Sequence, residues 1–545
     1  MRTPYFPEEA PIRFHGKKKE GNLRKGVLKI LQKRDILYVP TLEEISGKMT
    51  EQTNPTAEPK PEDIFEQRKA KAEEFAKAGI KPFGERFDGA IPVEKARALF
   101  VPDTENHPHV IIAGRITAFR VMGKSVFADV KDSSGRIQIY VQRDAVGEDF
   151  YKLFKKFDIG DIIGVEGDLF ATKTGEITVK ATRCTLLSKS LRPLPEKWHG
   201  LTDVEQRYRQ RYLDLIVNDE SREIFKKRFR ILSEIRRFLA DKGFLEVETP
   251  MLQNIPGGAA ARPFKTRYEA LDCDMYMRIA PELYLKRLLV GGFEKVFEMN
   301  RNFRNEGISR RHNPEFTMIE IYQAYGNCQT MMDLIEELVT TVAKNVIGTL
   351  QIPHANGKII DLTRPWKRVP YRDLIKERAG EDWFELSHDE KFARAKELGA
   401  PVMPDFEDRE ITHEIYEKLI EQTLIQPTFV TRLPAELVPL AKKCEDDPTL
   451  VDVYELEING QELSPGYSEL NDPIEQRKRF LEQAKMNDRT GELQKVIDED
   501  FMTAMEHGMP PAGGMGIGID RLVMLLTGAE SIRDVLLFPQ LRPKA

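Results

Sequence analysis

The alternation of apolar and polar residues is strongest between Val296 and Tyr325, where it predicts two strands joined by a polar loop. The first strand carries polar side chains on one face, at Glu298, Asn300, Asn302 and Arg304. The return strand places Phe316, Met318, Glu320 and Tyr322 opposite Thr317, Ile319 and Ile321. A face this polar indicates either the solvated side of an antiparallel sheet or a crevice in which ligands satisfy the charged groups.

A second region of alternation, residues 109–188, predicts five short strands with a helix between the third and the fourth. This order matches an OB-fold barrel, whose second and third strands form a face that binds single-stranded nucleic acid. We expect that face to present Phe127, Arg136, Gln138 and Tyr140. An aromatic ring beside Arg and Gln suits base stacking and recognition of base edges, whereas a single exposed aromatic is ordinary surface.

The remaining patterns divide the chain into five parts. They are a basic extension with a polar linker (1–60), a helical segment (61–106), the barrel (107–190), a linker (191–222) and a C-terminal domain (223–545) with an insertion around 350–425. We expect residues 1–60 to be disordered, and Met49 is an alternative start. The basic residues within 1–48 either attract phosphates or are incidental, and we favour the second because one basic cluster is a weak signal.

Composition narrows the class of protein. The 545 residues carry a formal net charge of −5, so a nucleic acid must bind to a local basic patch. The four cysteines are far apart and lack CxxC spacing, which argues against a zinc site and against a disulfide framework. The sequence has no apolar run of about 18 residues and no apolar signal core at its N-terminus. We therefore expect a cytoplasmic protein that does not contact membranes.

Two C-terminal stretches have chemistry that suits phosphates. Asn459-Gly460 predicts a tight hairpin in which Glu457 faces Glu462, with Glu455 on the same side. These carboxylates form either a solvated acidic face or a site for Mg²⁺ held together with substrate phosphates. Residues 514–526 predict a Gly-rich strand that leads into a helix with Arg521 in its first turn. This arrangement indicates either phosphate binding or close packing of the helix on the strand.

Together these stretches resemble the motifs of class II aminoacyl-tRNA synthetases. FLEVETP (244–250) is similar to motif 1, FRNEGISRRHNPEFTMIEIY (303–322) to motif 2 and GIGIDRLVML (516–525) to motif 3. PGGAAARPF (256–264) and YSELNDP (467–473) resemble stretches of the bacterial-type lysyl-tRNA synthetases. The resemblance extends from about Glu62 to the C-terminus and leaves only the basic extension outside.

The resemblance implies an α+β fold, with an N-terminal OB-fold β-barrel followed by a class II synthetase catalytic domain whose antiparallel sheet is flanked by helices. It implies an enzyme that activates L-lysine with ATP to lysyl-adenylate and pyrophosphate and then transfers lysine to the 3′ end of tRNA(Lys). It also implies Mg²⁺ as a cofactor and a homodimer formed through the motif 1 region.

The resemblance assigns roles residue by residue. The catalytic residues are Arg304 and Arg521. The ATP-binding residues are Arg304, Glu306, His312, Phe316 and Arg521. The metal ligands are Glu455 and Glu462. The lysine-binding residues are Gly258, Glu282, Tyr322 and Glu469. The anticodon-binding residues are Phe127, Gln138 and Glu176.

Two positions depart from the family. Pro465 stands where relatives usually have Asn, and it offers neither a side-chain amide nor a backbone N–H. Glu457 is an additional acid where relatives tend to be apolar. The acidic Glu282 and Glu469 argue against an aspartyl or asparaginyl enzyme, because a substrate carboxylate needs a cationic partner. Two alternatives stay open: a paralogue that lysylates a protein, and a catalytically silent relative.

Overall fold

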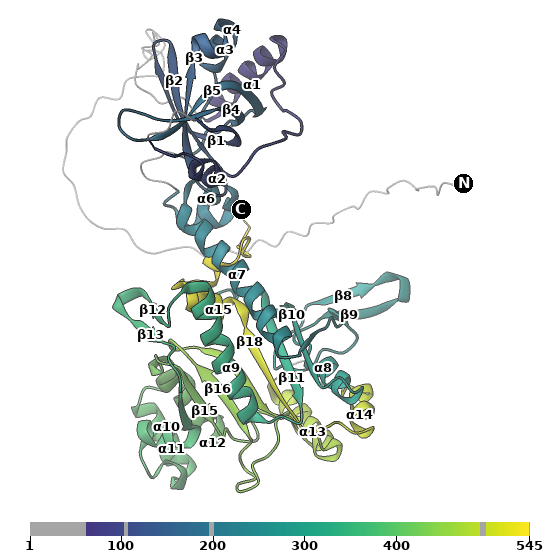
Figure 1. Ribbon diagram of the computed structural model, residues 1–545. Coiled ribbons are helices and arrows are strands. Elements are labelled where there is room, and N and C mark those ends of the chain that lie inside the picture. Colours follow the sequence, from purple (N-terminus) through teal and green to yellow (C-terminus); the bar gives the residue numbers. More distant parts are fainter. Residues whose placement is uncertain (1–60, 103–106, 196–200, 491–496, 544–545) are drawn as a thin grey trace, which may run out of the picture.

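Two bodies joined by a narrow junction make up the part of the chain that the structure describes (Figure 1). The structure is a computed structural model, and it describes residues 61–102, 107–195, 201–490 and 497–543. The predicted basic extension, including Met49, lies outside the described residues. Within them, no helix is both long enough and apolar enough to cross a membrane.

The smaller body is a closed five-stranded barrel with the strand order β1-β2-β3-β5-β4. Its strands are β1 (His109–Met122), β2 (Ser125–Lys131), β3 (Arg136–Gln142), β4 (Ile162–Ala171) and β5 (Ile177–Ser188). The short helices α3 (Arg143–Val146) and α4 (Glu148–Phe154) lie between β3 and β4, as the OB-fold prediction requires. Alternate residues of β2 and β3 fill the barrel, and α1 (Pro61–Lys77) adds Phe75 to this core.

The junction consists of three helices that lead from the barrel to the larger body. They are α5 (Val204–Arg209), α6 (Arg211–Val217) and α7 (Asp219–Asp241). At the start of α7, Asp219 forms an ion pair with Lys131 of β2, and Arg222 donates to the carbonyl of Asp132 over 3.2 Å. These contacts connect the end of the β2–β3 ribbon to the helix that enters the larger body.

The larger body is built on an eight-stranded sheet with the order β14-β15-β16-β17-β18-β11-β10-β6. Its strands are β6 (Leu245–Glu246), β10 (Lys295–Phe303), β11 (Glu315–Ala324), β14 (Lys367–Pro370), β15 (Thr428–Thr431), β16 (Val453–Glu457), β17 (Glu462–Ser468) and β18 (Ala512–Gly518). The central pairs are antiparallel, and only the outermost pairs, β6–β10 and β14–β15, are parallel.

Helices cover one face of this sheet and leave the other to polar side chains. The apolar side chains of α7, α9 (Cys328–Val342) and α15 (Ile519–Thr527) pack on Phe297 and Met299 of β10 and on Ile319 and Ile321 of β11. This burial is favourable because it removes apolar surface from water. The predicted division of both strands into an apolar and a polar face is therefore confirmed.

Smaller elements surround the sheet. A three-stranded sheet has the order β7 (Leu252–Gln253), β9 (Cys273–Met277) and β8 (Lys265–Tyr268), and α8 (Glu282–Val290) follows it. The interruption between β11 and β15 holds α10 (Tyr371–Ala379), α11 (His388–Glu397) and α12 (Asp408–Ile415). It also contains the hairpin β12 (Gln351–Pro353) and β13 (Ile359–Asp361). The last helices are α13 (Pro473–Thr490), α14 (Glu499–Glu506) and α16 (Ile532–Val535).

The segment around FLEVETP (244–250) is divided between two sheets. The structure has two short strands there, β6 and β7, which belong to different sheets. Pro250 lies between them and cannot donate to a strand ladder, so the extended segment changes partners at this point.

Candidate active site

All five residues predicted to bind ATP line one cavity of about 190 Å³ on the polar side of the sheet. They come from the end of β10, the loop after it, β11 and α15, and they are Arg304, Glu306, His312, Phe316 and Arg521. The predicted metal ligand Glu462 borders the same cavity. The hairpin that alternation indicated therefore forms a wall of a crevice.

Arg304 is a partly buried cation of this cavity. Its guanidinium lies 5.1 Å from the centroid of the Phe316 ring, and its Nε is buried without a hydrogen-bond partner. Burial lowers the pKa of Arg304, and the carboxylates of Glu306 and Glu462 oppose this effect. A buried donor without a partner is costly, so this side chain is suited to an anionic ligand in the cavity.

Arg521 and His312 enclose the other side of the cavity. Arg521 donates through Nη1 to the carbonyl oxygen of Glu462, and Nδ1 of His312 lies 2.9 Å from Oγ of Ser309. Burial and the nearby Arg521 lower the pKa of His312, so its ring is neutral at pH 7. Two arginines that share one small cavity favour a polyanion such as a triphosphate.

An ion pair holds the first turn of α15 against β11. Asp520 accepts hydrogen bonds from Nη1 of Arg228 on α7, at 2.7 Å, and from the backbone N–H of Thr317, at 2.8 Å. All three residues are buried. These contacts fix the position of the adjacent Arg521 relative to Phe316.

The acidic hairpin has the predicted register. Glu457 pairs with Glu462 across β16 and β17, and Glu455 lies opposite Pro465. Burial followed by the charge of Glu462 raises the pKa of Glu455 to about 8 and that of Glu457 to about 10. Oε2 of Glu457 has no hydrogen-bond partner.

These carboxylates fit a divalent cation by their donor chemistry, because hard oxygen ligands and crowded negative charge both favour one. The described residues contain no group of three or more His, Cys, Asp or Glu side chains already arranged around a metal position.

The residues predicted to bind lysine form a separate group next to α8. Gly258 and Glu282 line a second cavity of about 210 Å³, and Tyr322 and Glu469 are buried beside them. Gly258 has φ of +83°, and a Cβ there would lie 3.0 Å from that of Glu282. The loop can therefore approach α8 this closely only with glycine.

Three further residues belong to this group and were not predicted. Glu320 accepts a hydrogen bond from the hydroxyl of Tyr322 over 3.1 Å, and the hydroxyl of Tyr467 donates to Oε1 of Glu282 over 2.8 Å. Lys286 forms ion pairs with both Glu282 and Glu469. A sequence signal existed for two of them, because Glu320 shares a strand face with Tyr322 and Lys286 lies one helical turn after Glu282.

Pro465 borders the cavity that contains Arg304 and Arg521. The pairing of β17 with β18 begins at Gly466, so Pro465 occupies a position where β18 requires no N–H donor. The proline therefore does not interrupt the pairing of β17 with β18.

The predicted anticodon residues lie on the outer face of the barrel. The rings of Phe127 and Tyr140 pack against each other in a tilted arrangement with centroids 4.6 Å apart, and Oε1 of Gln138 accepts a hydrogen bond from Thr178. Glu176 lies 3.4 Å from Arg136 at the start of β5. The structure thus brings Phe127, Gln138 and Glu176 to one side of the barrel, around strands β2, β3 and β5.

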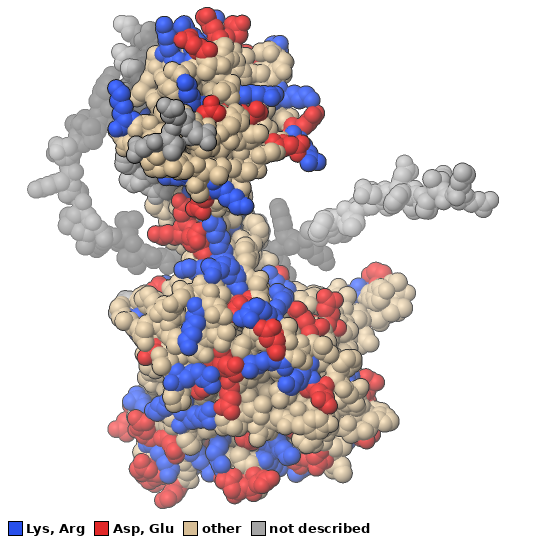
Figure 2. Space-filling model, in the orientation of Figure 1, with Lys and Arg blue, Asp and Glu red and all other residues tan. Residues whose placement is uncertain are grey.

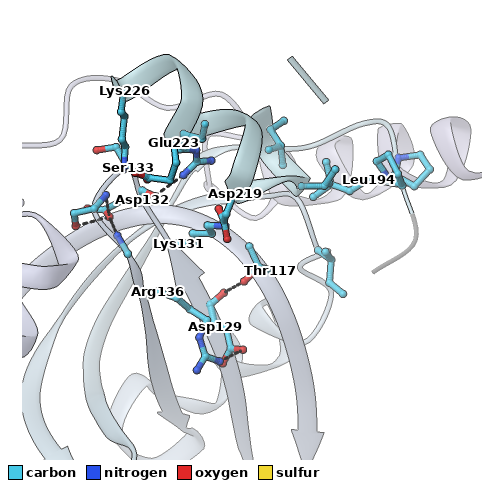
Figure 3. Close-up of a pocket in the computed structure, with 18 of the residues that line it drawn as sticks. Thr117, Asp129, Lys131, Asp132, Ser133, Arg136, Leu194, Asp219, Glu223 and Lys226 are labelled. Atoms are coloured by element: carbon cyan, nitrogen blue, oxygen red, sulfur yellow. Dashed lines mark hydrogen bonds and ion pairs between the residues drawn. The ribbon is translucent and has the colours of Figure 1, made fainter. Parts of the chain in front are cut away.

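A larger cavity of about 830 Å³ lies between the barrel and the start of α7 (Figure 3). Asp129 and Arg136, joined by an ion pair of 2.7 Å, line it together with Lys131, Asp219 and Lys226. On the face drawn in Figure 2, basic side chains are interspersed with acidic ones, and several lie at the junction. This cavity is lined by residues of the barrel and the junction, whereas the crevice that holds Arg304 is lined by residues of the larger body.

Comparisons with known proteins agree with this architecture. Residues 110–187 match the family described as "OB-fold nucleic acid binding domain", and residues 203–542 match "tRNA synthetases class II (D, K and N)". The chain therefore belongs to the class II tRNA synthetases, in the family that its description labels D, K and N, the letters of aspartate, lysine and asparagine.

The curated relatives narrow the family further. The lysine–tRNA ligase of Carboxydothermus hydrogenoformans is 55% identical over 483 residues, which cover 88% of this chain and 98% of the relative. The lysine–tRNA ligase of Pelotomaculum thermopropionicum is 54% identical over 485 residues, which cover 88% and 95%. That of Staphylococcus aureus strain MW2 is 51% identical over 489 residues. Within the class, the chain belongs to the lysine–tRNA ligase family.

Proposed function

We propose that this chain activates L-lysine with ATP to lysyl-adenylate and pyrophosphate, and then transfers lysine to the 3′ end of tRNA(Lys). One observation carries the proposal: the larger body contains two neighbouring groups of residues. One is the cavity lined by Arg304 and Arg521, and the other is the group of carboxylates and tyrosines around Glu282. The first suits a triphosphate, and the second suits an amino acid that carries two ammonium groups.

In the first step the carboxylate of lysine attacks the α-phosphorus of ATP, and pyrophosphate leaves. Negative charge develops on the α-phosphate oxygens, where the guanidinium of Arg304 stabilises it. Phe316 stacks on the adenine, Glu306 and His312 contact the nucleotide, and Arg521 holds the γ-phosphate. A covalent enzyme intermediate is not required, because positioning the two reactants and neutralising their charges lowers the barrier.

Glu455 and Glu462 are suited to hold Mg²⁺, because their carboxylates lie close together beside Glu457. A buried oxygen of Glu457 also lacks a hydrogen-bond partner, and a cation could coordinate it. When bound, the ion supplies positive charge that neutralises the phosphates. In the second step the terminal ribose hydroxyl of tRNA attacks the lysyl carbonyl and AMP leaves. Phe127, Gln138 and Glu176 read the anticodon on the barrel.

The proposal includes a homodimer through the motif 1 region and a cytoplasmic location. Exposed apolar side chains support the dimer: Leu245 is 52% exposed, Leu252 46% and Phe229 51%. Large apolar side chains grouped on a surface are suited to burial against a partner.

ATP–pyrophosphate exchange with a panel of amino acids tests the proposed function. Exchange should depend on lysine, and Arg304→Ala should abolish it while leaving the fold intact by circular dichroism. Exchange driven by aspartate or asparagine would contradict the assignment to lysine. Absence of exchange with every amino acid would favour the silent relative, and lysylation of a protein instead of tRNA would favour the paralogue.

A further inference from the structure

A lysine of the chain itself lies between the two carboxylates that are assigned to the substrate. Lys286 is fully buried on α8, and its Nζ lies 2.7 Å from Oε1 of Glu282 and 2.5 Å from Oε2 of Glu469. The same Nζ lies 5.6 Å from the centroid of the Tyr467 ring. An internal ammonium therefore occupies a position where the substrate's own ammonium groups must also be accommodated.

Lys286 partly neutralises the carboxylates of Glu282 and Glu469 and leaves one carboxylate oxygen of Glu469 without a hydrogen-bond partner. The Nζ of Lys286 engages Oε2 of Glu469, whereas Oε1 of that carboxylate has no hydrogen-bond partner. Oε1 lies close to Gly514, in space that a Cβ at this position would fill, since that Cβ would be 1.9 Å from the oxygen. Glu469 thus keeps one buried acceptor, Oε1, that a ligand can satisfy.

The charges that surround this cluster come from every element packed against it. The acids are Glu282 on α8, Glu298 on β10, Glu320 on β11 and Glu469 just after β17. The cations are Lys286 and Arg278, and the neutral phenols of Tyr322 and Tyr467 complete the group.

Arg278 is committed to Glu298, with Nη1 2.6 Å from Oε1. The three other carboxylates and Lys286 therefore carry two uncompensated negative charges when all are ionised. L-lysine brings two ammonium groups to this region, while its carboxylate is assigned to Arg304.

We propose that Lys286 is a positioning residue that stays in place during lysine binding and sets the charge of the pocket to match the two ammonium groups of L-lysine. The inference rests on the proposed function, because it takes Glu282 and Glu469 as contacts of the substrate. Lys286 could instead fill the empty site and leave when lysine enters. Removing its charge would then increase the affinity for lysine, whereas our proposal expects a decrease.

Because burial raises the pKa of the carboxyl groups in this cluster, the proposed role of Lys286 predicts that lysine binding depends on pH. Burial raises the pKa of Glu469 to about 8, and Lys286 opposes that rise. Burial followed by the charge of Glu282 also raises the pKa of Glu320 well above its usual range. Without Lys286 the pKa of Glu469 rises further, so more of this carboxyl is protonated at neutral pH. A protonated carboxyl attracts an ammonium group less strongly, so lysine binding should weaken and recover only at higher pH.

Lys286→Met, which keeps the length of the side chain and removes its charge, tests the proposal by ATP–pyrophosphate exchange. The KM for lysine at pH 7 should rise about tenfold or more, as expected from a pKa change of one unit or more when an opposite charge is lost. The KM for ATP should stay unchanged. The pH profile of kcat/KM for lysine should move to higher pH, and Lys286→Arg should restore the wild-type profile.

Lys189→Met is the matched control, because Lys189 is a fully buried lysine of the barrel that is paired with Asp158 and Asp161. It should lower stability without changing the pH profile for lysine. If Lys286→Met does not fold, Lys286→Gln takes its place, since it keeps a hydrogen-bond donor. A lower KM for lysine, or an unchanged KM and pH profile in folded Lys286→Met or Lys286→Gln, would overturn the inference. Lack of lysine-dependent exchange in the wild type would instead refute the proposed function.

Discussion

Glu457 is a single carboxyl whose surroundings decide its protonation. It is 1% exposed, its Oε1 lies 3.4 Å from the hydroxyl of Tyr416, and its Oε2 has no partner. Burial, followed by the charges of Glu462 and Glu421, raises its pKa to about 10. Glu457 is therefore neutral at pH 7 in the absence of a cation.

This protonation makes stability depend on pH. In the unfolded chain the carboxyl ionises at about pH 4.3, whereas in the folded chain it keeps its proton until about pH 10. The raised pKa therefore contributes stability that is fully present below about pH 4.3 and is lost progressively between about pH 4.3 and 10.

Glu457→Gln removes this pH dependence while keeping the shape of the side chain. Without Mg²⁺, the variant should gain in melting temperature relative to the wild type, and the gain should be larger at pH 8 than at pH 5. Differential scanning fluorimetry at both pH values measures this. Glu482→Gln, on the exposed surface of α13, is the control and should behave like the wild type. An equal effect of Glu457→Gln at both pH values would mean that Glu457 is ionised in the folded protein.

At the scale of elements, local sequence patterns predicted the strands β10 and β11 and the turn at Asn459-Gly460. They did not predict features that depend on contacts between residues far apart in the sequence. The period of two in β10 and β11 defined their buried faces, because an amphipathic strand of that length has one way to bury its apolar side. Asn459 and Gly460, with φ of +57° and +69°, form the tight turn that the dipeptide predicted, and this turn fixed the register of Glu457 against Glu462.

Other features lay beyond local patterns. Lys286 was missed because a lysine on an amphipathic helix usually faces water, and only the packing of α8 against the end of β17 buries it. The break between β6 and β7, and the parallel edge strand β14, likewise depend on contacts across the fold. The grouping of Arg304, Phe316 and Arg521 in one cavity came from the resemblance and not from periodicity.

Gly514 of strand β18 lies against Glu469 and Tyr322, two residues of the proposed lysine site. A Cβ on Gly514 would lie 1.9 Å from Oε1 of Glu469 and 2.5 Å from a ring carbon of Tyr322. Gly514→Ala should therefore displace one or both side chains and raise the KM for lysine in the exchange assay by about tenfold or more, the cost of a lost charged contact.

Gly516 on the same strand provides the comparison for Gly514. A Cβ there would lie 3.3 Å from the flexible end of Met318, which can move. The KM for lysine should accordingly change less in Gly516→Ala than in Gly514→Ala. Equal effects of the two substitutions would show that β18 responds to any added methyl group and that Glu469 is not specifically involved.

At the scale of the whole molecule, the barrel and the crevice belong to separate bodies, which the junction helices α5, α6 and α7 connect. Phe127 belongs to the barrel and packs against Tyr140, far along the chain from every residue that lines the crevice. Phe127→Ala should therefore spare lysine-dependent exchange and lower the rate of tRNA charging about tenfold, since stacking on one base contributes roughly 1–3 kcal/mol. Both assays on one preparation measure this, and equal losses in both would contradict an anticodon role.

The junction should influence how well tRNA engages both bodies at once. Lys131 on β2 pairs with Asp219 at the start of α7, and α7 continues to Arg228, which holds Asp520 beside Arg521. Reversing the charge in Lys131→Glu places two like charges together and loosens the contact between the barrel and the larger body. Since an exposed pair contributes at most about 1 kcal/mol, the KM for tRNA should rise about two- to fivefold, with exchange unaffected.

Asp219→Lys combined with Lys131→Glu separates this explanation from direct tRNA contact. The double variant restores an opposite-charge pair at the junction, so the KM for tRNA should return toward the wild-type value if the pair acts by orienting the barrel. If Lys131 instead contacts a tRNA phosphate, the double variant still has the unfavourable carboxylate that Lys131→Glu introduces. Its KM for tRNA should then stay as high as that of Lys131→Glu alone. Repeating both measurements at higher salt should shrink the differences, because screening weakens exposed charges in either case. The return of affinity in the double variant therefore decides between a structural link and a binding contact.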